Sequence, residues 1–112
     1  FPRVLPRVLS IASASTITPN GDNCDQYDVT ALATNLTIDA PTGTPFDAQK
    51  LILRIKDNGT PRTLTWTTGA GHYRAIGLDL PTITLAGQVL YVGIIYNSQD
   101  NFWDIIAVAQ QS

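Results

Sequence analysis

The stretch KLILRIKDNGTPRTLTWTT, residues 50–68, carries the clearest signal for the fold. In its first half, apolar residues alternate with other residues from position 51 to position 56, and in its second half Leu64 and Trp66 alternate with threonines. Alternation with a period of two is typical of a strand with one buried face. Asn58-Gly59 lies between the halves and favours a tight turn, because both residues tolerate positive φ. We therefore predict a β-hairpin with one apolar face.

The composition extends this prediction to the whole chain. The 112 residues are 44% hydrophobic and only 14% charged, where an average protein has about 25% charged residues. All nine acidic residues are aspartates, methionine is absent, and Lys50 and Lys56 are the only lysines. Good helix formers are therefore scarce, and Thr, Val and Ile favour strands. One all-β domain is predicted.

Turn signals divide the chain into about eight short strands. Besides the 50–68 stretch, strands are expected near residues 7–18, 27–33, 35–41, 73–76 and 82–86, and two long strands close the chain. Many short strands with regular turn signals, and no alternation with helices, predict an antiparallel β-sandwich or a small barrel.

The two closing strands, 88–96 and 102–110, are apolar on both faces. Leu90, Val92, Ile94 and Tyr96 share one face of the first strand, and Val89, Tyr91 and Ile95 share the other. On the second strand, Ile106 and Val108 oppose Trp103 and Ile105. One face of a sandwich covers the core, and soluble monomers rarely expose an apolar patch of roughly several hundred Å². We expect the second face to be covered by another copy or by the amino-terminal segment; the pattern leaves open which face is inner.

That segment is FPRVLPRVLS, residues 1–10. Pro2 and Pro6 favour an extended chain and interrupt any apolar helix of a signal peptide. We predict an extended arm over residues 1–10 that precedes a single domain at 11–112. For residues 7–10, a first strand of the sandwich is the alternative.

Few residues suggest a catalytic or metal-binding site. His72 is the only histidine and Cys24 the only cysteine, too few ligands for a zinc site. Asp22, Asn23, Asp25 and Asp28 lack the spacing of a calcium loop. No catalytic residue, cofactor or metal is expected. The net charge of −2 argues against nucleic acid, and no apolar run is long enough to span a membrane.

Aromatic residues leave a further alternative open. Trp66, Tyr73, Tyr91, Tyr96 and Trp103 could stack on a sugar ring if they are exposed. Aromatic residues in alternating strands are more often part of the core, which is the interpretation we favour here.

Four segments resemble a small domain that recurs among virion proteins of tailed bacteriophages. They are residues 17–33, 41–66, 73–81 and 91–110, and the most specific features are KDNGTPRTLTW at 56–66 and the closing YN-x5-WD at 96–104. The family includes capsid decoration proteins and carboxy-terminal domains of head or tail fibres. The resemblance implies a jelly-roll sandwich without enzymatic activity that often forms homotrimers on the virion surface.

From this resemblance we expect a capsid decoration, or cement, protein that binds the major capsid protein or another virion protein. The alternative is a head or tail fibre domain that binds a host-surface polysaccharide. The residues predicted to contact another subunit or the particle are Phe1, Pro2, Arg3, Val4, Leu5, Arg7, Leu90, Val92, Ile94, Tyr96, Ile106 and Val108.

Overall fold

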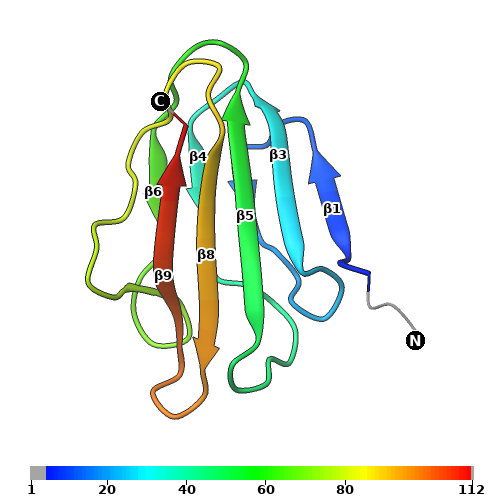
Figure 1. Cartoon of the computed structure of the whole chain (residues 1–112), viewed down its shortest axis with the longest axis vertical. Helices are drawn as coiled ribbons and strands as arrows, with labels where there is room; N and C mark the ends of the chain where they lie inside the picture. The colour runs from blue at the N-terminus through cyan, green and yellow to red at the C-terminus, as the bar shows by residue number, and fades with distance from the viewer. Residues whose placement is uncertain (1–4, 112) are drawn as a thin grey trace.

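The computed structural model describes residues 5–111, which form nine strands and no helix (Figure 1). The strands are β1 (Val8–Ile11), β2 (Thr16–Ile17), β3 (Gln26–Leu32), β4 (Leu36–Ile38), β5 (Lys50–Asp57), β6 (Leu64–Trp66), β7 (Tyr73–Ala75), β8 (Leu90–Asn97) and β9 (Phe102–Gln110). The prediction of an all-β chain is confirmed.

The strands form two sheets that enclose the core. The larger sheet has six strands in the order β1-β3-β5-β8-β9-β7, and the smaller has three in the order β2-β4-β6. In Figure 1 the smaller sheet lies behind the larger one. No helix in the described part of the chain is long and apolar enough to cross a membrane.

The strand directions differ from the antiparallel arrangement that we predicted. From β1 to β6 the chain alternates between the two sheets, so β1, β3 and β5 are parallel neighbours in one sheet and β2, β4 and β6 in the other. The β7·β9 pair is also parallel, and only β5·β8 and β8·β9 are antiparallel. Because each strand is followed by one in the opposite sheet, the chain returns to a sheet in the same direction.

The predicted hairpin at residues 50–68 is wrong for the same reason. Its alternation is present, since Leu51, Leu53 and Ile55 are buried in β5 and Leu64 and Trp66 in β6. The turn, however, leads from the larger sheet to the smaller one, and the two strands do not pair. Alternation identifies the buried face of each strand, but both sheets cover the same core, so it does not identify the sheet.

The core is continuous between the layers. The smaller sheet contributes the row Ile17–Ile38–Trp66, whose members are paired across β2, β4 and β6. The Trp66 ring packs edge-on against Tyr73, with 5.1 Å between ring centroids. Their polar atoms are satisfied, because Trp66 Nε1 donates to the Pro81 carbonyl and the Tyr73 hydroxyl donates to the Asp39 carbonyl, both at 2.8 Å.

The amino-terminal segment enters the larger sheet earlier than an arm over residues 1–10 would allow. β1 pairs with β3 from Val8 onward, and the backbone N–H of Arg7 donates to Asp25 Oδ2 at 2.8 Å. Residues 7–10 thus belong to the domain, which is the alternative that the sequence left open. Residues 1–4 lie outside the described residues.

Candidate functional site

The face of the larger sheet that points away from the smaller sheet is the candidate site, and we call it the outer face. Two rows of paired residues cross it. One row is Val8–Gln26–Ile52–Gly93–Ala107 and the other is Ser10–Asp28–Arg54–Tyr91–Ala109. In Figure 1 this side of the sheet lies toward the viewer, across β3, β5, β8 and β9.

The centre of the outer face is apolar and open to water. Ile52, Tyr91 and Ile106 are 40%, 41% and 52% exposed. Gly93 lies between Ile52 and Ala107 in its row, so the sheet surface is low between larger side chains. Two hollows of about 460 and 350 Å³ both have Tyr91 in their lining. Tyrosine is one of the residue types that most often dominate the energy of an interface.

The outer side of the smaller sheet provides a contrast. A paired row on this side consists of Thr16, Thr37 and Thr65. It lies on the other side of the sheet from the buried row of the same three strands. Hydroxyl side chains on the solvent side are what a two-layer sandwich normally has. The apolar centre is therefore a property of the outer face and not of both sides of the molecule.

Ion pairs flank the apolar centre. On the β3–β5 side, Arg54 donates to Asp28, whose other oxygen accepts from Gln26 Nε2 at 2.8 Å. On the β7–β9 side, Arg74 Nε donates to Asp104 Oδ1 at 2.7 Å. These carboxylates are already hydrogen-bonded within the chain, so covering them does not leave an unpaired charge.

The structure corrects the predicted choice of face on β8. Leu90, Val92 and Ile94 are no more than 2% exposed and point toward the core, so they are not available for contact with another subunit. Pairing with Ile55, Leu53 and Leu51 places them on the inner side. The residues of β8 that point to the outer face are instead Tyr91, Gly93 and Ile95.

A β-bulge in β9 explains why the alternation was misleading there. Ile94 pairs with Ile105 and its neighbour Gly93 pairs with Ala107, so Ile106 is the extra residue. Beyond the bulge the facing of β9 is reversed, and Val108 pairs with the buried Val92 and is half-buried. Of the two predicted β9 contacts, only Ile106 is well exposed.

The remaining predicted contacts have mixed positions. Tyr96 is half-buried and packs against Trp103, with 5.0 Å between ring centroids. Leu5 is 64% exposed, and Arg7 is paired with Asp25 at 3.0 Å. Phe1, Pro2, Arg3 and Val4 lie outside the described residues. Ile52 was not among the predicted contacts, because it shares one side of its strand with Arg54 and Lys56.

His72 does not form a nucleophile–base–acid relay with its neighbours. Its Nδ1 lies 2.8 Å from Thr67 Oγ1 and 4.0 Å from Asp39 Oδ1. A relay needs the nucleophile and the orienting carboxylate on opposite ring nitrogens, whereas both lie beside the same one here. Cys24 is buried, and burial raises the pKa of its thiol.

The aspartates considered for calcium have separate partners. Asp22 accepts the N–H of Thr44, Asp25 accepts from Arg7, and Asp28 accepts from Arg54. Among residues 5–111, no group of three or more His, Cys, Asp or Glu side chains is placed to hold a metal ion.

The aromatic residues considered for sugar stacking are mostly core. Trp66, Tyr73 and Trp103 are buried, which the sequence favoured, while Tyr91 and Tyr96 remain partly accessible. Phe46 was not predicted and is 79% exposed. It lies in a loop rather than a strand, where periodicity carries no signal.

Comparison with protein-family models, with curated proteins and with solved structures found no match.

Proposed function

We propose that this chain is a structural, non-enzymatic domain of a tailed-phage virion that self-associates through its outer face and decorates the head as a homotrimer. The observation that carries the proposal is the apolar centre of the outer face, where Ile52, Tyr91 and Ile106 are exposed. The resemblance of four segments to phage virion domains supports the location and the trimer. The proposal does not depend on a jelly-roll strand order.

The free energy from burying a patch of ordinary size suggests that the subunits associate weakly in solution and more strongly on the particle. An apolar patch of roughly 400 Å² per subunit is ordinary for a functional surface. Its burial contributes about 10 kcal/mol at about 25 cal/mol per Å². Loss of translational and rotational freedom costs about 4–15 kcal/mol, which is comparable. The free trimer is thus expected only at high protein concentration, and binding to a shell of capsid protein favours it further by raising the local concentration.

The amino-terminal residues supply the second contact in this proposal. Leu5 is exposed, and the segment leaves the sheet beside β1, at the edge of the larger sheet (Figure 1). An extended apolar segment suits a groove or a free strand edge on a neighbour. Removing residues 1–6 leaves β1 and the Arg7–Asp25 contact in place, so the domain folds while its affinity for the particle falls.

The oligomeric state tests the proposal directly. Sedimentation of the full chain over a range of concentrations is expected to show a monomer that associates to a trimer. Tyr91→Lys and Ile106→Lys place a charge in the contact and are expected to leave a monomer. Ile83→Lys is the matched control, because Ile83 is 54% exposed but lies outside the outer face. A stable wild-type monomer at high concentration, or an effect of Ile83→Lys alone, would contradict the proposal.

Copy number on purified virions tests the location. A decoration protein is present at a number set by the symmetry of the capsid, whereas the alternative, a polysaccharide-binding fibre domain, is present at a few copies per tail. Antibody labelling of the tail alone would contradict the decoration protein and favour the fibre domain.

A further inference from the structure

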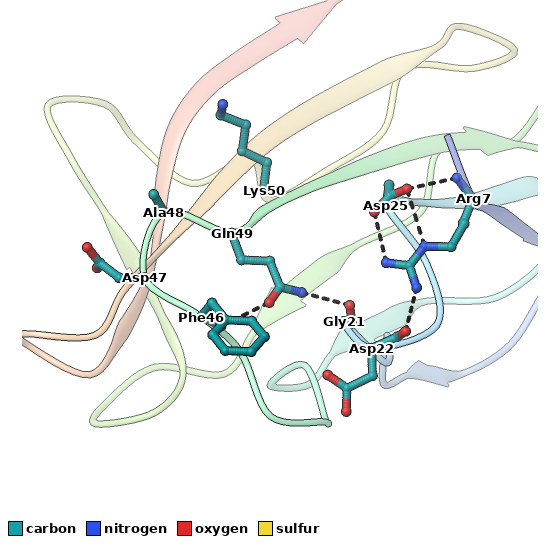
Figure 2. Close-up of a pocket in the computed structure, with 9 residues that line it drawn as sticks. All are labelled: Arg7, Gly21, Asp22, Asp25, Phe46, Asp47, Ala48, Gln49 and Lys50. Atoms are coloured by element: carbon teal, nitrogen blue, oxygen red, sulfur yellow. Dashed lines mark hydrogen bonds and ion pairs between the residues drawn. The ribbon is translucent and has the colours of Figure 1, made fainter. Parts of the chain in front are cut away.

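A second surface, separate from the outer face, lies at one end of the sandwich. It is a groove of about 650 Å³, within the range of small-molecule sites. Gly21 and Gln49 form its floor, Phe46 stands on one side, and the Arg7–Asp25 pair stands on the other (Figure 2). None of these residues takes part in the apolar centre described above.

Phe46 is exposed to water on a turn whose backbone is fixed by hydrogen bonds. The N–H of Phe46 donates to Gln49 Oε1 at 3.0 Å, and the N–H of Gln49 donates back to the Phe46 carbonyl at 3.1 Å. Ala48 closes the turn with φ of +67°, which is unfavourable for a residue with a Cβ, and its N–H donates to the Tyr96 carbonyl. Backbone strain of this kind clusters at ligand sites.

The floor of the groove is equally fixed. Gln49 Nε2 donates to the Gly21 carbonyl at 2.7 Å, which ties the Phe46 turn to the loop before β3. A Cβ on Gly21 would lie 2.9 Å from this nitrogen, so only glycine leaves the floor as low as it is. The groove therefore has its shape before any ligand arrives, which lowers the entropy cost of binding.

The charges around the groove are close to balanced. Arg7 and Asp25 neutralise each other across 3.0 Å, and the other charged lining residues are Asp22, Asp47 and Lys50. Two positive and three negative side chains leave an excess of one negative charge. A phosphate or a sulfated chain would be repelled, and a purely apolar ligand would strip water from the charges without replacing its hydrogen bonds.

Two of the carboxylates are fixed acceptors. Asp22 accepts the N–H of Thr44 at 3.0 Å, and Asp47 accepts the N–H of Ser98 at 3.0 Å. The backbone hydrogen bond from Ser98 lowers the pKa of Asp47. Each carboxylate has further lone pairs that can accept from hydroxyl groups.

We propose that this groove binds a neutral sugar unit of a glycan. A pyranose ring has an apolar C–H face that stacks on Phe46, and it has hydroxyl groups around its rim that match the charged and polar side chains bordering the groove. This combination of one flat apolar face and several neutral donors matches the exposed ring and the near-balanced charge. The proposal stands whether or not the chain forms a trimer.

An array of neutral and acidic oligosaccharides, probed with the labelled full chain, tests the proposal. In a second step, soluble hexasaccharides of each neutral hexose are titrated into ¹⁵N-labelled protein, and the amide signals are followed by NMR. We expect neutral glycans to bind and to shift the amide signals of Gly21 and Gln49. Phe46→Ala is expected to weaken binding at least tenfold and Phe46→Trp to retain it, because stacking needs the ring alone. Ile83→Ala is the control, as another exposed apolar residue.

Three outcomes would overturn the proposal: no neutral glycan bound at millimolar concentration, binding of acidic glycans only, or equal binding by Phe46→Ala and the wild type. A loss of oligomer mass in Phe46→Ala together with an empty array would assign Phe46 to a contact between copies instead. Because Phe46→Ala removes only an exposed side chain, unchanged circular dichroism is expected for it, and a failure to fold does not obscure the result.

Discussion

At the scale of single residues, Asp57 at the end of β5 is a buried carboxylate that is held by three hydrogen bonds. Its carboxylate is 2% exposed and accepts from Thr84 Oγ1 at 2.6 Å, from Gly87 N at 2.7 Å and from Gly59 N at 2.9 Å. It thereby fixes the turn after β5 and the loop before β8. Burial by itself would raise the pKa of Asp57, but these hydrogen bonds together outweigh it and the pKa is lowered.

Asp57→Asn is expected to destabilise the protein in a pH-dependent way. The amide oxygen can still accept from the two glycine N–H groups, but the charge is lost and the –NH₂ group replaces the oxygen that accepts from Thr84, at a cost of about 2–3 kcal/mol at pH 7. A carboxylate with a lowered folded-state pKa contributes its stability above its unfolded pKa of about 3.9 and loses it as the pH falls through the folded value. The difference from the wild type in urea unfolding should therefore shrink between pH 5 and pH 2. Asp79→Asn, at an exposed position, is the control. An equal difference at both pH values would contradict the assignment.

At the scale of elements, the bulge at Ile106 decides which side chains of β9 reach the core. It lets Trp103 and Ile105 face inward before it and Val108 after it. A strict period of two would instead place Val108 with Ile106 on the outside. The bulge therefore keeps three large apolar residues inside and presents a fourth at the surface.

Deletion of Ile106 is expected to be tolerated. The strand becomes regular, every other β9 residue keeps its partner on β8, and the free energy of unfolding changes by less than about 2 kcal/mol. Deletion of Gly93 from β8, the strand of the pair without an extra residue, should prevent folding, because a slip of one residue turns one side of the strand inside out. Urea unfolding followed by near-ultraviolet circular dichroism compares the two, and equal damage from both deletions would show that Ile106 is not an extra residue.

The same elements show how far the sequence predicts the structure. Alternation identified the buried side of β5 and β6, since Leu53 and Trp66 are indeed core. It could not identify the sheet to which each strand belongs, because strands on either side of one core have the same pattern. The alternation also could not predict the bulge, which interrupts it, or the exposure of Phe46, which lies in a loop outside any strand.

At the scale of the whole molecule, the winding of the first six strands between two sheets makes each layer from residues far apart in the chain. Only the larger sheet then receives β7, β8 and β9, so it is twice as wide as the smaller one. Its outer face has no layer of this chain over it among the described residues, although its centre is apolar. The apolar centre of this uncovered face is the physical reason for expecting a second copy.

The stability of the molecule should therefore depend on its concentration. A partner that binds only the folded chain stabilises it by mass action, by about 2.7 kcal/mol at a hundred times the dissociation constant. For a domain of this size that corresponds to a rise in Tm of roughly 10 °C, measurable by calorimetry at concentrations below and above the dissociation constant. Ile106→Lys should have the same Tm at all concentrations, because the charge resists burial in the contact, whereas Ile83→Lys should keep the wild-type dependence. A wild-type Tm that does not change with concentration would mean that the outer face of this sheet stays in water.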